Sequence, residues 1–148
     1  MKKDFQQLPH TADIAIRVYG DTLADLFRNA LIGMFQVVRP IVPSCRVEGD
    51  RVVCNKLPVR REVAVDAHDV ESLLVDFLSE ALYLSDIHNE AYLDAQITVR
   101  DDKKHIEATL HGIGVDGFEA AELKAVTYHD LVVEQTAQGW QVVVVFDI

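Results

Sequence analysis

Two aspartates near opposite ends of the sequence carry the chemistry for which this chain is best equipped. Asp13 opens an alternating segment near the start, and Asp147 directly precedes Ile148, the last residue. If the first and last strands pair antiparallel, the start of one lies beside the end of the other. Asp13, Asp147 and the terminal carboxylate of Ile148 would then gather in one corner. Hard oxygen ligands gathered in this way suit calcium or magnesium.

The same two aspartates allow other interpretations. Carboxylates brought together repel each other and lose hydration unless a cation or a proton intervenes. A bound metal relieves the repulsion, and so does a raised pKa on one aspartate, which would suit acid–base catalysis. A third interpretation needs no chemistry, because Asp13 would cap a loop and Asp147 would end a strand in water. The spacing of the two residues does not decide among these.

A second polar group lies in residues 122–129. If this segment is a strand, Lys124, Val126 and Tyr128 share one face. A lysine beside an acidic corner could pair with Asp147 or contact a partner's phosphate. The simpler alternative is a solvated lysine at the end of a strand.

The motifs of self-sufficient enzymes are missing from the sequence. The glycines of residues 112–119 lack the spacing of a dinucleotide or P-loop cradle, so we expect a flexible loop there that could contact a partner. The chain has no HExxH motif, nucleophile elbow or EF-hand loop. Its six histidines are scattered without the spacing of zinc ligands. We therefore expect a protein that is not an enzyme.

Two amphipathic helices are predicted to hold these residues in place. In residues 22–38 apolar side chains recur every three or four positions, with Thr22 as the N-cap and Pro40 as the stop. A second apolar stripe runs from Asp69, its predicted cap, to Leu84. Each stripe indicates a helix that buries one face.

Alternating segments predict strands over the rest of the chain. We expect strands in residues 13–19, 59–65, 91–100, 105–111, 123–134 and 140–148, and a hairpin in residues 45–54. Two helices with single apolar faces and a mainly antiparallel sheet indicate an α+β fold in two layers. We expect both helices on one face of a sheet of about seven strands, with residues 1–148 forming a single domain.

The charge of the chain limits its partners. The formal net charge is −10 at pH 7, and no run of Lys and Arg offsets it, so we expect no direct nucleic-acid binding. An acidic surface suits a cation or a basic partner protein, and it equally suits a surface kept soluble by self-repulsion. No apolar stretch reaches the roughly 18 residues that cross a bilayer. The N-terminal segment lacks the apolar block of a secretory signal, so we expect a cytoplasmic protein.

The two cysteines flank the predicted hairpin. Residues 49–50 form a favoured two-residue turn, and the resulting register sets Cys45 opposite Cys54. An opposed pair can form a disulfide under oxidation. In a cytosolic protein we expect two reduced cysteines in the core instead. The same alternation predicts Val47 and Val52 on the inner face.

With these residues in hand, the sequence resembles the archease family. The segments that carry the resemblance follow the family's order along the whole chain. They are His10-Thr11-Ala12-Asp13, Tyr19-Gly20, residues 74–84, residues 122–129 and Phe146-Asp147-Ile148. The HTAD opening and the Lys-Ala-Val-Thr-Tyr-His stretch are specific only in combination.

This resemblance implies an accessory protein of an RtcB-type RNA ligase, which joins RNA ends in tRNA splicing or RNA repair. Archeases promote guanylylation of the ligase and its multiple turnover, and they do not ligate RNA themselves. The family also implies an acidic divalent-metal site, with calcium as the expected ion. Carried over to this sequence, the metal ligands are Asp13, Asp147 and Ile148. The residues needed for ligase activation are Asp13, Lys124 and Asp147.

Two other functions stay open. A small metal-assisted phosphoester hydrolase would use the same corner, with one aspartate as the base, and would turn over its substrate without a partner. A general chaperone or RNA-associated module would bind unfolded clients or RNA directly. RNA binding of that kind would weaken strongly with salt, and the acidic charge argues against it.

Overall fold

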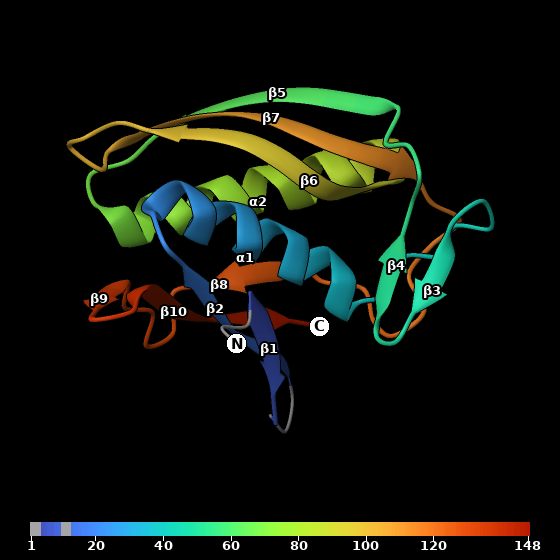
Figure 1. Ribbon diagram of the computed structural model, residues 1–148, viewed down its shortest axis with the longest axis horizontal. Helices are drawn as coiled ribbons and strands as arrows, with labels where there is room; N and C mark the ends of the chain where they lie inside the picture. The colour runs from blue at the N-terminus through green and yellow to red at the C-terminus, as the bar shows by residue number, and fades with distance from the viewer. Residues whose placement is uncertain (1–3, 10–12) are drawn as a thin grey trace.

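In the computed structural model, which describes residues 4–9 and 13–148, two helices lie between two antiparallel sheets (Figure 1). His10, Thr11 and Ala12 lie outside the described residues. The helices are α1 (Leu23–Val37) and α2 (Val70–His88). The first sheet contains β1 (Phe5–Leu8), β2 (Asp13–Gly20), β10 (Gly139–Asp147) and β8 (Ala125–Thr127) in that order, with β9 (Glu134–Thr136) also paired to β10. The second sheet contains β5 (Val59–Asp66), β7 (His105–Gly114) and β6 (Glu90–Val99).

Both helices begin at the caps that the sequence predicts. The Thr22 hydroxyl accepts a hydrogen bond from the Asp25 N–H at 3.1 Å, and the Asp69 carboxylate accepts one from the Ser72 N–H at 2.7 Å. The second helix continues four residues past the predicted end at Leu84. It stops at Asn89, which adopts a left-handed conformation with φ 54°. Asparagine tolerates this conformation, which commonly ends helices.

The core is built from both sheets and both helices. Phe27 of α1 packs against Phe77 of α2, with ring centroids 6.0 Å apart. Phe35 of α1 meets Tyr92 of β6 edge to face at 5.4 Å, which joins the helix to the second sheet. Phe146 of β10, fully buried, contributes from the first sheet. Each such side chain adds roughly 1.5–3 kcal/mol through burial.

The α+β class, with two helices and mainly antiparallel strands, is confirmed, but the strands differ in number and arrangement. The described residues form ten strands rather than about seven, divided between two sheets and a separate hairpin. Residues 29–36 of α1 are all buried, because a sheet covers the helix on each side (Figure 1). A helix packed on one face of a single sheet would keep a solvated side.

One predicted strand is largely wrong. Of residues 123–134, only 125–127 and Glu134, the first residue of β9, are in strands. Asp130 has a positive φ of 50°, and the Leu131 N–H donates to the Tyr128 carbonyl in a turn. Leu131 and Val133 are buried two residues apart, which mimics the alternation of a strand. Strand β1 was not predicted.

A disulfide joins the two ends of the hairpin formed by β3 (Arg46–Glu48) and β4 (Arg51–Val53). The predicted register, with Val47 opposite Val52, is confirmed. The expectation of two reduced cysteines is wrong, since Cys45 and Cys54 are bonded with their Cα atoms 4.6 Å apart. That separation lies within the range of disulfides. The expectation rested on the cellular compartment, whereas the register alone favours the bond.

The hairpin attaches to the rest of the protein through β4. The Gln36 amide of α1 donates to the Val52 carbonyl at 2.9 Å and accepts from the Val52 N–H at 2.8 Å. Val47, predicted to lie inside, is 72% exposed because β3 is the outer strand. The Arg51 guanidinium lies 4.7 Å from the centroid of the Phe5 ring, which connects the hairpin to β1.

A partly buried ion pair joins β5 to β6 beside the C-terminal end of α2. Two hydrogen bonds of 3.0 and 2.9 Å join the Arg61 guanidinium of β5 to the Glu90 carboxylate of β6. The Tyr92 hydroxyl donates to the same carboxylate at 2.9 Å, and the Ser85 hydroxyl donates to the Glu90 carbonyl at 2.6 Å. Burial acts to raise the pKa of Glu90, but the hydrogen bonds from Arg61 and Tyr92 outweigh it and lower the pKa.

Replacing Glu90 should therefore make the free energy of unfolding less sensitive to low pH. A lowered carboxyl pKa stabilises the fold above the unfolded pKa, and this stabilisation is lost as the pH falls through the folded pKa. We expect Glu90→Gln to lower the free energy of unfolding by about 1–3 kcal/mol at neutral pH. Denaturant unfolding from pH 7 down to about pH 3 should show the difference in free energy of unfolding between the variant and the wild type becoming smaller. The control Glu48→Gln, which removes a charge from an exposed ion pair, should change the free energy of unfolding little. If the difference between Glu90→Gln and the wild type stays constant with pH, the ionised Glu90 carboxylate is not the source of the stabilisation.

Candidate functional site

The register of β2 and β10 brings Asp13 and Asp147 directly opposite each other. Eight consecutive pairs join the strands, from Trp140 opposite Gly20 to Asp147 opposite Asp13. Residues opposed in this way have Cβ atoms about 4.5–5.5 Å apart and point to the same face of the sheet. The predicted meeting of the two aspartates is thus present. We call Asp13, Asp147 and Ile148 the acidic corner.

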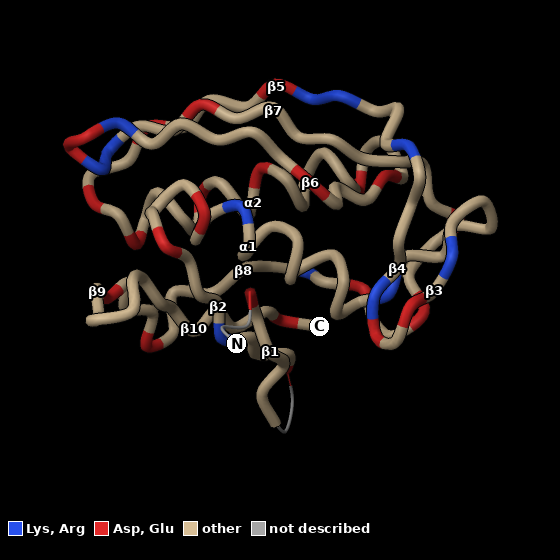
Figure 2. The backbone as a smooth tube through the Cα atoms, viewed as in Figure 1, with Lys and Arg blue, Asp and Glu red and all other residues tan. Residues whose placement is uncertain are grey.

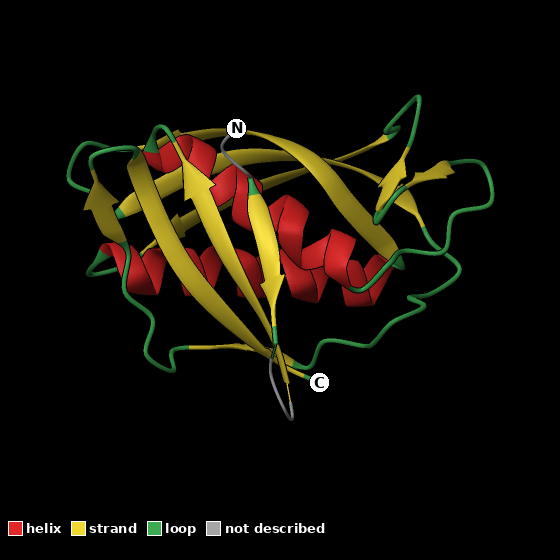
Figure 3. Cartoon of the chain, turned by 60° about the horizontal axis from the view of Figure 1, so that its bottom comes forward, coloured by secondary structure: helices red, strands yellow, loops and turns green. Residues whose placement is uncertain are grey.

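The acidic corner lies on the face of the sheet that points away from the helices. Phe146, the neighbour of Asp147, is fully buried, so alternation turns Asp147 outward. Asp147 is exposed, whereas Asp13 is half-buried and its Oδ1 is shielded from solvent. Figure 3 shows this sheet in front of the helices, with the C-terminus at its lower end. Like charges directly opposite each other on a sheet destabilise it.

Lys124 is held beside the corner by its backbone. Its N–H donates to the Asp147 carbonyl at 2.8 Å, and the next residue, Ala125, pairs with Asp147 in the register of β8 and β10. The Lys124 side chain is exposed. Within residues 4–9 and 13–148, no carboxylate lies within ion-pair distance of its ammonium group. The predicted alternative of a Lys124–Asp147 side-chain pair is therefore not present, and the ammonium group remains available to an anion from outside.

The donor atoms of the acidic corner fit a hard divalent cation, although they form an incomplete ligand set. Asp13 and Asp147 supply carboxylate oxygens, and the adjoining Ile148, 46% exposed, supplies main-chain oxygen. In the described part of the chain, no three His, Cys, Asp or Glu side chains gather as a metal site. Calcium takes six to eight oxygen ligands. Water or a partner molecule would have to provide the others.

The chain that follows Lys124 is fastened to α2. The Tyr128 hydroxyl donates to the Asp76 carboxylate at 3.1 Å, and the Val133 N–H donates to the Glu71 carboxylate at 2.9 Å. Partial burial and the hydrogen bond to Asp76 raise the pKa of Tyr128. No local pattern in the sequence signalled the role of Asp76, because its partner lies on a distant segment. Helix α2 therefore supports the chain just after β8, the strand that directly follows Lys124.

The glycine-containing segment 112–119 is not the flexible loop that we expected. Residues 112–114 belong to β7. The Asp116 N–H then donates to the Ile41 carbonyl at 3.0 Å, and the Ile41 N–H donates to the Gly117 carbonyl at 2.9 Å. The Glu119 N–H donates to the Arg39 carbonyl at 2.9 Å. These bonds fix the segment against the end of α1.

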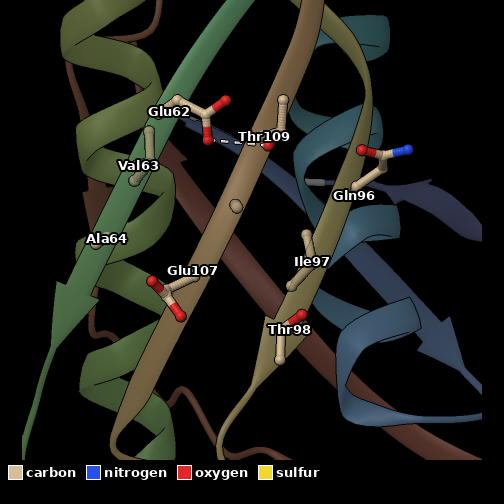
Figure 4. Close-up of a pocket in the computed structure, with 9 residues that line it drawn as sticks. Glu62, Val63, Ala64, Gln96, Ile97, Thr98, Glu107 and Thr109 are labelled. Atoms are coloured by element: carbon tan, nitrogen blue, oxygen red, sulfur yellow. Dashed lines mark hydrogen bonds between the residues drawn. The ribbon is translucent and has the colours of Figure 1, made fainter.

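The outer face of the second sheet carries a shallow hollow of ≈ 480 Å³ (Figure 4). Five of its nine lining residues are polar, and the Thr109 hydroxyl donates to the Glu62 carboxylate at 3.0 Å. The guanidinium of Arg60 also donates to Glu62, at 2.9 Å. Arg60 binds Oε1 and Thr109 binds Oε2 of Glu62, and these hydrogen bonds lower the pKa of Glu62. Both carboxylate oxygens are therefore already engaged within the sheet. The acidic corner is the better candidate site.

Acidic and basic residues are mixed along the described chain, whose formal net charge is −10 over the full sequence. Figure 2 shows the basic residues spread over many elements, among them β5, the β6–β7 turn and the β3–β4 hairpin, with acidic residues between them. No helix of the described residues is long and apolar enough to span a membrane.

Comparison with known proteins gives the chain clear relatives. Residues 5–148 match the model of the Archease protein family (MTH1598/TM1083). The chain is 35% identical to protein archease of Methanosarcina barkeri, with 99% of this chain and 97% of that protein aligned. It is 36% identical to protein archease of Pyrococcus abyssi, with 99% of each chain aligned.

Solved structures resemble the fold over its full length. Protein 1598 of Methanobacterium thermoautotrophicum superposes with a TM-score of 0.65 at 26% identity, covering 98% of this chain and 99% of that one. An archease from Thermotoga maritima, described as a possible chaperone, gives 0.62 at 22% identity, covering 100% and 98% of the two chains. At that identity the second likeness supports the fold alone.

Removing one of the two opposed charges should stabilise the protein in the absence of metal. We expect Asp147→Asn to raise the melting temperature by about 1–4 °C in a chelating buffer, because it relieves repulsion with Asp13. The gain should shrink at high salt, which screens the repulsion. Thermal unfolding followed by circular dichroism measures both effects. Glu80→Gln, an exposed change of equal charge on α2, is the control, and a less stable Asp147→Asn variant would contradict the repulsion.

Proposed function

The chain belongs to the archease protein family, and we propose that it is a non-catalytic activator of an RtcB-type RNA ligase in the cytoplasm. In this role it promotes guanylylation of the ligase and its multiple turnover in tRNA splicing or RNA repair. The observation that carries the proposal is the pairing of Asp13 with Asp147, with Lys124 held alongside. These are the positions that the family resemblance assigns to ligase activation.

A divalent cation, with calcium as the first candidate, would bind at the acidic corner. The carboxylates of Asp13 and Asp147 and the main-chain or terminal oxygen of Ile148 would hold it. A cation there supplies positive charge that offsets the two opposed carboxylates and attracts phosphate oxygens. Asp13 is half-buried whereas Asp147 is exposed, so we infer that Asp13 sets where the cation sits.

Lys124 would contact a phosphate of the nucleotide at the ligase's active site. Its backbone hydrogen bond to Asp147 fixes where the side chain starts, and its exposed ammonium group has no carboxylate partner among the described residues. Lysine binds phosphate as a compact charge with three donors. The backbone hydrogen bond places Lys124 beside Asp147 along the chain, next to the acidic corner.

The corner alone offers little for an enzyme. A hydrolase would need one aspartate as a base and a substrate pocket around it, whereas Asp147 is exposed at the end of a strand. The net charge of −10 opposes sequence-independent contacts with RNA phosphates. Both features support an accessory role in which a second protein holds the RNA.

A chaperone-like role is the second candidate. The Thermotoga maritima archease is described as a possible chaperone. A general chaperone would suppress aggregation of unrelated unfolded proteins, and the acidic corner would be irrelevant to that activity. An activator of the ligase would depend on the corner and would act on one partner.

The central test uses isosteric changes in the corner. We expect Asp13→Asn and Asp147→Asn each to reduce stimulation of ligase guanylylation at least about tenfold, because each removes a charge needed to position the cation. Labelled GTP transferred to the purified ligase of the same genome measures the activity. Thermal unfolding checks that each variant is folded, and Glu80→Gln serves as the matched control. A folded corner variant with full stimulation would refute the proposal.

Metal binding has its own test, which needs no ligase. A ligand that binds only the folded state stabilises it by about 2.7 kcal/mol at 100 times its Kd. We expect calcium to raise the melting temperature of the chelated wild-type protein by several degrees. The Asp13→Asn variant should lose this rise. An equal rise in the variant would place the bound ion elsewhere.

A further inference from the structure

A second feature of the surface lies directly before Lys124 in the chain. A cavity of ≈ 90 Å³ opens between the C-terminal half of α2 and residues 115–123. We call it the α2 groove. Most of its lining is apolar, and Asp86 and Glu122 lie at its opposite walls. The apolar side chains are Phe35, Val38, Leu82, Val115, Phe118 and Leu123.

Both walls of the α2 groove are fixed before anything binds. Residues 116–119 are hydrogen-bonded to residues 39–41 after α1. On the other side, the Val115 N–H donates to the Asn89 carbonyl at 2.8 Å, and the Ser85 hydroxyl donates to the Glu90 carbonyl at 2.6 Å. A preformed groove loses little conformational entropy when a partner enters it.

The edge of the α2 groove carries negative charge that no ion pair within the described residues offsets. Asp86 and Glu122 are both exposed, and neither has an ion-pair partner in the described part of the chain. Tyr83 and Ile87 lie one turn apart on the surface of α2, next to Asp86, and are 59% and 51% exposed. A tyrosine face attracts a cation and is typical of protein interfaces. The surroundings therefore complement a positively charged group.

The size of the cavity decides what kind of occupant fits. Small-molecule sites usually measure about 300–1,000 Å³, so a cavity of ≈ 90 Å³ suits a single side chain instead. An apolar floor with acidic edges suits a side chain with an aliphatic stem and a cationic head. Arginine meets both requirements, stacks on aromatic rings and is common among the residues that dominate interfaces.

We propose that the α2 groove receives an arginine from the surface of the RNA ligase, an inference that rests on the proposed function. Glu122 lies two residues before Lys124, whose N–H binds the Asp147 carbonyl. A single partner covering this stretch would touch the α2 groove and the acidic corner together. The arginine anchors the complex, and the anchored complex presents the corner and Lys124 to the nucleotide site.

The experiment reverses the two charges at the edge of the groove. We expect Asp86→Lys combined with Glu122→Lys to raise the Kd for the purified ligase at least about 30-fold, because the arginine then meets two positive charges. Isothermal titration calorimetry measures the affinity. The milder pair Asp86→Asn with Glu122→Gln keeps the shape and should weaken binding by a smaller factor. Both sites are exposed, and thermal unfolding checks that each variant is folded.

A matched variant separates the groove from the overall charge. Asp50→Lys combined with Asp101→Lys makes the same change in net charge at two turns that do not line the groove, and we expect its Kd to stay within about threefold of the wild type. Equal weakening by both double variants overturns the inference, as does unchanged binding by the groove variant. A groove variant that alters only self-association in sedimentation also overturns it, because the occupant is then a second copy of the chain.

The outcomes distinguish this inference from the proposed function. Wild-type protein that fails to bind or stimulate the ligase overturns both together. Binding and stimulation that survive in the groove variant overturn the arginine anchor alone. Loss of binding in the groove variant, with binding retained and stimulation lost in Asp13→Asn, supports an anchor that is separate from the activating corner.

Discussion

The register between β2 and β10 is the constraint on which the rest of the site depends. Val142, Val144 and Phe146 are buried opposite Val18, Ile16 and Ile14, and these apolar pairs hold the two strands in alignment. A slip of one residue would turn the three β10 side chains from the core to solvent. Burying each is worth roughly 1.5–3 kcal/mol. The unfavourable opposition of two aspartates, worth at most about 1 kcal/mol, cannot compete with that alignment.

Helix α2 extends this constraint to the rest of the surface. Its first half holds the chain after β8 through Asp76 and Glu71. Its last turn is tied to the second sheet through the Ser85 hydroxyl, which donates to the Glu90 carbonyl, and the same turn forms one wall of the α2 groove. Because one rigid helix supports both features, the distance between the acidic corner and the groove is set by the core. A partner that uses both can therefore meet a surface formed in advance.

The sequence predicts features that depend on neighbouring residues or on a strong alternating pattern. The caps Thr22 and Asp69, the hairpin register and the pairing of Asp13 with Asp147 are of this kind. The division of the strands into two sheets could not be predicted in this way, because an alternating pattern does not identify which strands pair. In residues 30–35 of α1, an unbroken run without a polar side chain was the available signal for a sheet on each side of the helix. Leu131 and Val133 led to the wrong prediction of a strand up to residue 134, because two buried residues two positions apart need not belong to a strand.

The incompleteness of the acidic corner bears on how it would work. Two carboxylates and an oxygen of Ile148 provide fewer ligands than the six to eight that calcium takes. A storage site would surround its ion with protein oxygens, whereas this corner leaves several positions open. Phosphate oxygens of a nucleotide can fill such positions, and the exposed ammonium group of Lys124 can bind the same phosphate. The open ligand positions and the neighbouring lysine both favour a cation shared with a partner's nucleotide over one held by this chain alone.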